Sequence, residues 1–398
     1  MCCSGDLEAD IRFGRTPSIE SRGPVRIALI ANLYPDATHP ALGTFVLTRV
    51  EALRAAGVAV DVIAVPGWAA HHRVVAKYGH LAARAVARSI LARRQRLHYD
   101  VVEGHIAYPT GVVALPVARL LGAKLALFAH GADVFQVAWR NPLHSRLARM
   151  VIGAADLVVA NSRFTYDHIL TRFEISPSKV VVASPGIDLG TFRERCSNRN
   201  APRNGILYVG RLDPEKGAHV LLRALADCPP YIAQDTLTVV GSGREADRLR
   251  KEADQLGLNA RFLGALRPTE VASEMRRALV TVVPSIYPEP LGLVAIEAMA
   301  AGSLVVASSA GGLRETVLEG ETGFTSRPGD AGDLAAALVR AYHVAQDRPR
   351  YEALRARAFL MACEHDRARA VEITLEAYQR LIELGNGQAG HESERSIL

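Results

Sequence analysis

Short apolar runs alternate with longer amphipathic segments along most of the chain, as expected for parallel strands joined by helices. In the first half, apolar runs at 25–30, 58–65, 101–103, 124–128, 157–160 and 180–183 predict strands, and the segments 44–56, 110–121 and 142–153 predict helices. In the second half, strands are expected at 205–209, 238–240, 261–264, 278–283 and 304–307, and helices at 291–301, 330–346, 350–363 and 366–384, with one more ending at 226. This alternation predicts an α/β protein with doubly wound domains.

The length of 398 residues fits two domains of ordinary size. We interpret the polar run 193–204 as a linker between a first domain at 24–192 and a second domain at 205–365. A last helix follows at 366–384, and the polar segments 1–23 and 385–398 are predicted to be disordered tails.

One βαβ unit in the second half contains two acidic residues in unusual surroundings. Glu297 is the only ionisable side chain between residues 291 and 302, in a helix that is apolar all round and therefore buried. A buried carboxylate needs a hydrogen-bonding partner, either in the protein or in a ligand. Just before this helix, Glu289 lies between two prolines, and the backbone N–H groups of Leu291, Gly292 and Leu293 are available for an anion at the helix start.

Glu289 and Glu297 are separated by seven residues. The stretch E-P-L-G-L-V-A-I-E-A-M-A-A-G resembles the signature of retaining glycosyltransferase family four, also described as glycosyl transferases group 1. The resemblance implies the GT-B fold, in which two Rossmann-like domains face each other across a cleft, and a last helix that packs back on the first domain. It also implies that Glu289 and the following N–H groups contact the donor sugar, and that Glu297 holds the nucleotide ribose. The alternative is a Glu297 paired with a neighbouring arginine and a Glu289 that faces water.

Two further segments extend the resemblance. The segment 210–217, G-R-L-D-P-E-K-G, is similar to the family element that clamps the donor diphosphate, which assigns Gly210, Arg211 and Lys216 to that group. Alone, Arg211 and Lys216 are equally consistent with two surface cations. His130 and Gly131, in H-G-A-D, resemble the element that lies against the donor sugar, where Asp133 would orient the loop.

Other glycines and one more histidine are weaker candidates. Gly43 stands at a helix start and partly matches a glycine loop that faces the donor diphosphate in the family, although a simple turn is the better interpretation of Gly43 alone. The loop 308–312, which contains two glycines, also suits a phosphate or a sugar hydroxyl. His105 follows a strand and is as consistent with a structural role as with a catalytic one. Glu315 is interpreted as structural.

The composition points to a chain without a membrane span. Five scattered cysteines indicate neither a disulfide framework nor a metal site, and we expect a cytoplasmic protein. The longest apolar region, 112–128, is interrupted by Pro116, Arg119 and Lys124, which argues against a transmembrane helix. The net charge is +6, and residues 71–99 contain seven Arg or Lys and no acidic residue.

Within this basic segment, Arg73, Lys77, Arg84 and Arg88 are expected on one side of a helix, with Val74, Leu81, Val86, Ile90 and Leu97 on the other. Such a helix fits either peripheral contact with anionic lipid, on the inner face of the plasma membrane, or an ordinary solvated surface.

The resemblance implies transfer of a sugar from a nucleotide-diphosphate sugar, such as a UDP or GDP sugar, with retention of configuration. No cofactor is expected besides this donor. No two aspartates lie two residues apart, as the Asp-x-Asp metal motif requires, so we expect no metal. A glycan or lipid-linked acceptor in polysaccharide or glycolipid synthesis is expected, bound by the loops at 31–43 and 68–80. The alternatives are a sugar-nucleotide 2-epimerase of the same fold and a basic nucleic-acid-binding protein; we expect no nucleic acid partner.

Overall fold

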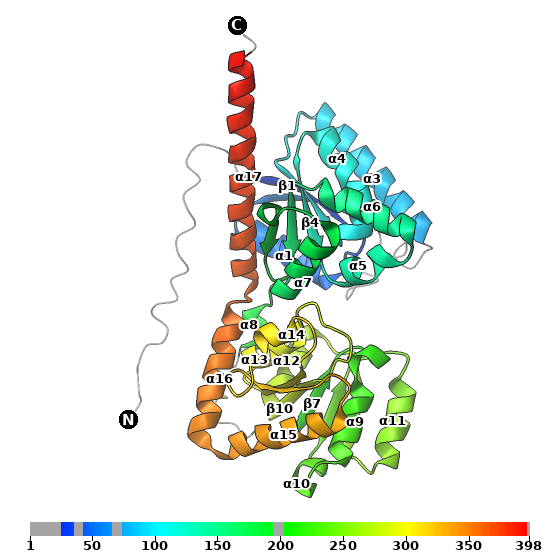
Figure 1. Cartoon of the computed structure of the whole chain (residues 1–398), viewed down its shortest axis with the longest axis vertical. Coiled ribbons are helices and arrows are strands. Elements are labelled where there is room, and N and C mark those ends of the chain that lie inside the picture. The colour runs from blue at the N-terminus through cyan, green and yellow to red at the C-terminus, as the bar shows by residue number, and fades with distance from the viewer. Residues whose placement is uncertain (1–24, 36–42, 66–73, 194–202, 396–398) are drawn as a thin grey trace.

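The computed structural model describes residues 25–35, 43–65, 74–193 and 203–395, with the side chains of 74–75 and of 385–395 left out. The described chain forms two α/β lobes stacked along the long axis of the molecule (Figure 1). The predictions for residues 1–23 and for most of the 193–204 linker lie outside the described residues. No helix in the described part of the chain has the length and apolar character that crossing a bilayer demands.

The first lobe is built on a parallel sheet with the strand order β2-β1-β3-β4-β5-β6. Its strands are β1 (Arg26–Ala31), β2 (Ala59–Ala64), β3 (Val101–His105), β4 (Lys124–Ala129), β5 (Leu157–Ala160) and β6 (Val180–Val182). The helices are α1 (Thr44–Ala55), α3 (Val74–Arg94), α4 (Ala107–Leu121), α5 (Ala132–Phe135), α6 (Pro142–Gly153) and α7 (Arg163–Phe173).

Alternate side chains of these strands supply two separate cores, because successive strand residues point to opposite faces. On β1, Ala28 and Ile30 face the core made with α3, α4, α6 and α7. Ile27 and Leu29 face the core made with α1 and α17 (Arg367–Arg395). Both faces of the sheet are therefore covered, which explains the continuous apolar runs in the sequence.

The second lobe repeats this plan with the strand order β12-β11-β10-β7-β8-β9, again parallel. Its strands are β7 (Ile206–Val209), β8 (Leu237–Val240), β9 (Ala260–Gly264), β10 (Val280–Val283), β11 (Leu304–Ser308) and β12 (Phe324–Ser326). One face packs on α9 (Ala218–Ala226), α11 (Ala246–Gln255) and α15 (Ala331–Gln346), and the other on α12 (Pro268–Arg277), α13 (Leu293–Ala300) and α16 (Arg348–Cys363). The short helices are α8 (Leu189–Phe192), α10 (Pro230–Ala233) and α14 (Leu313–Thr316). The predicted α/β class with two Rossmann-like domains is confirmed.

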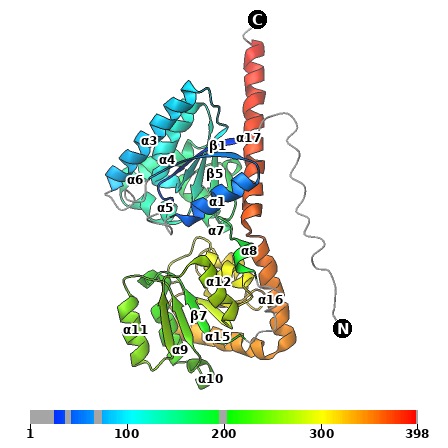
Figure 2. The same cartoon turned by 180° about the vertical axis from the view of Figure 1, so that it is seen from behind.

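The chain returns to the first lobe at its C-terminal end. Helix α16 packs on the second lobe, and α17 then runs along the first (Figures 1 and 2). There, Val371 and Tyr378 enter the core beside Ile27. The backbone stays helical to Arg395, past residue 384, where the sequence predicts the helix to end. Residues 385–395 are thus helical and do not form the predicted disordered tail.

Two contacts hold the lobes together beside the cleft. The Glu315 carboxylate, from the second lobe, accepts the N–H groups of Arg163 at 2.8 Å and Phe164 at 2.5 Å, at the start of α7 in the first lobe. A carboxylate there satisfies free N–H groups and complements the helix dipole. The Ser162 hydroxyl donates to the carbonyl of Pro290. The structural role predicted for Glu315 is therefore one of joining the two lobes.

Candidate active site

A cavity of about 370 Å³ lies between the lobes, at the carboxyl ends of both sheets. In open parallel α/β sheets this is the edge at which ligands bind. The first lobe contributes Phe45, His130, Asn161 and Pro185 to the lining. The second lobe contributes Tyr208, Val209, Gly210, Lys216, Val283, Pro284, Ser285, Glu289, Pro290, Leu291, Gly292, Leu293 and Val294.

The loop before α13 presents free backbone donors to this cavity. Among the described residues, the N–H groups of Leu291, Gly292 and Leu293 donate to no protein acceptor. Gly292 has a φ of 88°, and a Cβ there would overlap the side chain of Leu313. Only glycine therefore allows the chain to enter the helix at this point. The helix start with free N–H groups that the sequence predicts is present, and its binding of an anion stays a prediction.

Glu289 and Lys216 lie in direct contact on one wall of the cavity. The Lys216 Nζ donates to Glu289 Oε1 at 2.5 Å, and the Ser285 hydroxyl donates to the same oxygen at 2.5 Å. Lys216 reaches this position from a tight turn closed by Gly217, whose φ is 71°. Glu289 does not face water, as one interpretation of the sequence proposed, because it is paired inside the cleft.

Arg211 is not brought into the cavity, although Gly210 beside it lines the wall. Its side chain is 65% exposed and forms ion pairs with Asp213 at 2.5 Å and Glu215 at 3.1 Å. The two cations that the sequence placed together on the donor diphosphate thus occupy different surroundings.

Glu297 lies one turn beyond the lining residues Leu293 and Val294 on α13. It is half-buried, and among the described residues no side chain pairs with its carboxylate. Burial raises its pKa to about 8. Among the described residues no arginine neutralises Glu297, so that alternative is wrong, and its carboxylate is open to water or to a polar group of a ligand.

On the opposite wall, Asp133 shapes the loop that carries His130. Its carboxylate accepts the N–H groups of Gly131 at 2.7 Å, His130 at 3.1 Å and Ala107 at 2.8 Å. Burial raises the pKa of Asp133 to about 6, although these N–H groups oppose the rise. Gly131 has a φ of 120°, and a Cβ there would overlap the ring of Pro290.

Both halves of the chain match known protein families. Residues 42–191 match the family described as Glycosyltransferase Family 4, and residues 193–358 match Glycosyl transferases group 1. The chain is 34% identical over 316 residues to the D-inositol 3-phosphate glycosyltransferase of a Nocardioides species, covering 71% of this chain and 68% of that one. The chain belongs to this glycosyltransferase family.

A glycogen synthase of Mycobacterium tuberculosis is 33% identical over 252 residues, 60% of this glycosyltransferase chain. The match spans 59% of the length of that relative. Among solved structures, sucrose-phosphate synthase from Thermosynechococcus elongatus superposes with a TM-score of 0.72 at 24% identity, covering 91% of this chain and all of that one. Anabaena HepE in complex with UDP and glucose gives a TM-score of 0.69 at 22% identity, covering 89% of this chain and all of that one. The structural neighbours support the GT-B fold.

Two glycine segments of this glycosyltransferase make close packing contacts, and their predicted contacts with a ligand stay predictions. Gly43 does not line the cavity, and a Cβ there would lie 2.6 Å from the backbone carbon of Leu33, so it serves a close packing of two backbones. In the loop 308–312, the N–H of Gly312 donates to the carbonyl of Glu289 at 2.7 Å. A Cβ on Gly311 would overlap the same carbonyl. This loop therefore supports Glu289, and its contact with a phosphate or a sugar hydroxyl stays a prediction.

Several lining residues have no counterpart among the sequence candidates. Asn161 follows β5 directly and donates from Nδ2 to the carbonyl of His130 at 3.3 Å, and within the described chain its buried Oδ1 has no hydrogen-bond partner. Phe45 packs against the His130 ring with centroids 4.6 Å apart. A polar residue directly after a buried strand was the available signal for Asn161. In the described part of the chain no group of three His, Cys, Asp or Glu side chains is arranged to hold a metal ion.

Replacing Glu297 with Gln should stabilise the fold increasingly as the pH rises. Folding raises the pKa of Glu297 to about 8 from an ordinary value of 4.5, so the wild type loses stability as the pH rises between these values. We expect the gain in unfolding free energy to be small near pH 5 and to grow by at most about 1.4 kcal/mol per pH unit towards pH 8. Urea unfolding of the wild type and the variant at several pH values measures this gain in unfolding free energy. The exposed Glu321→Gln is the control, and a gain that does not depend on pH would contradict the proposed titration.

Replacing Lys216 with Ala should remove a cation from the cavity wall and lower turnover about a hundredfold, the usual loss for one transition-state donor. Arg211→Ala should have a smaller effect, because Arg211 lies outside the lining. Steady-state kinetics with an accepted sugar nucleotide compare the two variants. Arg244→Ala, which also removes a cation beside Asp213, is the matched control. Wild-type turnover in Lys216→Ala would remove Lys216 from the site.

Proposed function

We propose that this protein transfers a sugar from a nucleoside-diphosphate sugar to a hydroxyl group of an acceptor. One arrangement carries the proposal: Lys216, Glu289 and the free N–H groups at the start of α13 face His130 across one cavity between the lobes. Cations and N–H donors suit a diphosphate, and carboxylate and imidazole suit sugar hydroxyls.

In the proposed reaction, the bond between the anomeric carbon and the diphosphate oxygen breaks, and the acceptor oxygen bonds to the same face of that carbon. The proton of the acceptor hydroxyl passes to an oxygen of the departing diphosphate, so configuration is retained. Lys216 and the N–H groups of residues 291–293 stabilise the negative charge that develops on the leaving group. Glu297 would accept the ribose hydroxyls, and no cofactor other than the donor takes part. We propose that the reaction needs no metal ion.

For the donor, UDP-glucose is the first candidate, because HepE has been solved with UDP-glucose. The relatives named glycogen synthase and D-inositol 3-phosphate glycosyltransferase suggest a glycan or a phosphorylated cyclitol as acceptor chemistry. We propose a glycan or lipid-linked acceptor in polysaccharide or glycolipid synthesis, in the cytoplasm.

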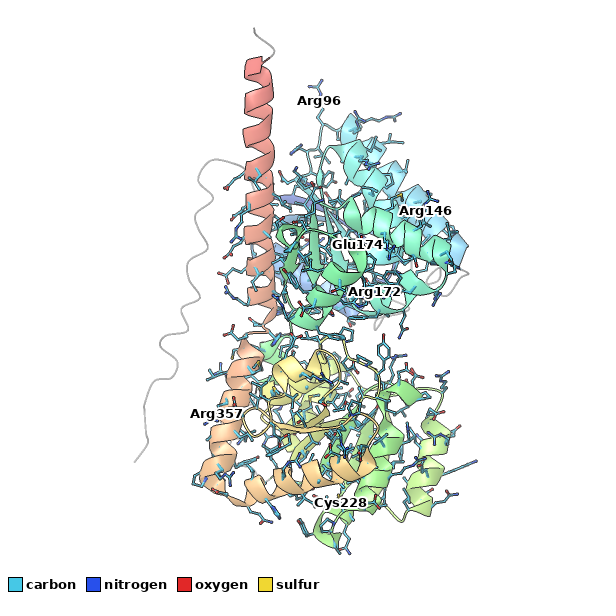
Figure 3. All side chains as sticks on the ribbon, viewed as in Figure 1. Arg96, Arg146, Arg172, Glu174, Cys228 and Arg357 are labelled. Carbon is cyan, nitrogen blue, oxygen red and sulfur yellow. The ribbon has the colours of Figure 1, made fainter. Side chains whose placement is uncertain are left out.

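An exposed apolar surface on α3 supports the proposal of a lipid-linked acceptor. Leu81 faces the core as the sequence predicts, but Val86 and Ile90 are 47% and 46% exposed, so the prediction that they share its face is wrong. With Ala83, Ala87 and Leu91 they form an outward apolar stripe. Arginines flank this stripe, and Arg96, just beyond α3, projects away from the domain (Figure 3). Arg73 lies outside the described residues, as do residues 68–73 of the predicted acceptor loop 68–80 and residues 36–42 of the predicted acceptor loop 31–43.

An exposed apolar stripe with arginines along its edges matches the interface-lying helices that bind anionic bilayers. Arginine side chains would contact lipid phosphates while the stripe enters the boundary between head groups and acyl chains. We propose that α3 rests on an anionic membrane surface at the inner face of the plasma membrane.

Donor use should be tested with UDP-glucose and GDP-glucose. We expect one of them to raise the melting temperature and to be hydrolysed slowly without an acceptor, with the released sugar first appearing in the anomeric configuration of the donor by NMR. An epimerase would instead change the C2 configuration. Absence of binding to any sugar nucleotide would contradict the proposal, and strong salt-dependent DNA binding would favour a nucleic-acid partner.

Membrane contact should be tested by sedimentation with phospholipid vesicles. We expect binding to vesicles with anionic lipid, weakened by salt, and about tenfold weaker in Ile90→Glu, which places a charge in the apolar stripe. Leu360→Glu on α16, where the leucine is 63% exposed on the second lobe, is the control and should bind as the wild type. Equal binding by Ile90→Glu and the wild type would contradict the role of α3.

A further inference from the structure

A buried network of charged and polar side chains lies behind His130. Strand β3 places Glu103 and His105 on the same face, two residues apart, and both are almost completely buried. Arg49 from α1 and Tyr378 from α17 complete it. Such groups are costly to bury unless each hydrogen bond is satisfied. The arrangement of these bonds therefore determines where the protons lie.

Glu103 can act only as an acceptor in this network. Arg49 donates from Nε to Oε2 at 2.9 Å and from Nη2 to Oε1 at 2.7 Å, and the Tyr378 hydroxyl donates to Oε1 at 2.7 Å. Burial alone would raise the pKa of Glu103, but the Arg49 guanidinium holds it well below its usual range. Glu103 is thus an ionised carboxylate, and any further neighbour in hydrogen-bond contact must donate to it.

That neighbour is His105, whose Nε2 lies 3.2 Å from Glu103 Oε2 and must carry a proton. Burial lowers the pKa of His105, so the ring is neutral and its Nδ1 has a lone pair. Nδ1 lies 3.2 Å from Nε2 of His130, which must therefore be the donor. Burial also lowers the pKa of His130, and a neutral His130 with a proton on Nε2 has a lone pair on Nδ1. Among the described residues, Nδ1 of His130 has no protein partner.

We propose that Glu103, acting through His105, is a positioning residue that keeps His130 in the Nε2–H tautomer and so presents its Nδ1 lone pair to the cavity. Nδ1 would then accept a hydrogen bond from a hydroxyl of the bound sugar, a role that rests on the proposed function. The opposite tautomer would place an N–H donor there and could accept nothing. His105 connects the two residues, and its ring stacks on Phe128, with centroids 4.6 Å apart, which fixes its plane.

The last helix takes part in this arrangement. Tyr378 donates to Glu103, and the Thr374 hydroxyl accepts a hydrogen bond from Nη2 of Arg49 at 3.2 Å. Both residues lie on α17, which reaches the first lobe only after the second lobe has been completed. Docking of α17 therefore completes the hydrogen bonds of Glu103 and Arg49.

The tautomer can be read directly from the wild-type protein labelled with ¹⁵N-histidine. A long-range ¹H–¹⁵N spectrum distinguishes protonated from bare ring nitrogens, and comparison with His130→Asn assigns the signals of His130. We expect a protonated Nε2 and a bare Nδ1 in the absence of any donor. A bare Nε2 or a doubly protonated ring in the neutral pH range would overturn the proposal. This measurement does not depend on whether a sugar nucleotide is used.

His105→Phe removes both hydrogen bonds of the linking ring and leaves the Arg49–Glu103 pair intact, so we expect it to fold. His130 should then show a mixture of tautomers, with turnover of the donor at least tenfold lower and the affinity for UDP, measured by calorimetry, unchanged.

His144→Phe on α6 loses a comparable hydrogen bond to Tyr108 and serves as the matched control. An unchanged His130 spectrum or wild-type turnover in His105→Phe would overturn the proposal. If neither the wild type nor the control uses any donor, the proposed function fails, while the wild-type spectrum still decides the tautomer.

Discussion

The close packing of residues 289–291 against glycines of both lobes is the constraint on which the cleft depends. Gly311 and Gly312 lie against the backbone of this loop from the second lobe, and Gly131 lies against Pro290 from the first. A side chain at any of these glycines would displace the loop, because a Cβ would occupy the space of backbone or ring atoms. This packing directs Glu289 and the free N–H groups at the start of α13 into the cavity. In the same loop, the carbonyl of Pro290 accepts a hydrogen bond from the Ser162 hydroxyl of the first lobe. The loop that shapes the site therefore also joins the lobes.

Two carboxylates of this protein, the fully buried Glu103 and the half-buried Glu297, have opposite surroundings. Glu103 is surrounded by donors from Arg49, Tyr378 and His105, and it stays ionised because each oxygen is satisfied. Glu297 has no protein partner among the described residues, and burial raises its pKa. The first arrangement defines the positions of neighbouring side chains, whereas the second leaves a carboxylate without a described protein partner at the expense of stability. Unsatisfied groups of this kind are typical of binding sites.

Most strands and long helices could be predicted from the sequence, because both sheets are buried on two faces and their strands are short continuous apolar runs. Helix α6 begins and ends where the sequence predicted. Helices α11 and α12 were missed because they are polar surface helices with narrow apolar stripes, Leu249 and Ala253 in one and Ala272 and Met275 in the other. The exposure of Val86 and Ile90 was missed because an apolar residue on a helix is expected to face the core.

The sequence by itself determined the fold class, the family and the local chemistry of the site: Glu289 before a helix start, Lys216 in a turn closed by glycine, and Glu297 in an apolar helix. These are properties of neighbouring residues, and local patterns record them. Only the tertiary structure decided that Lys216 pairs with Glu289, that Arg211 turns outward, and that Tyr378 meets Glu103, 275 residues away in the chain. Such partners are set by how whole lobes and helices pack, and side chains so distant in sequence leave no local pattern that would join them.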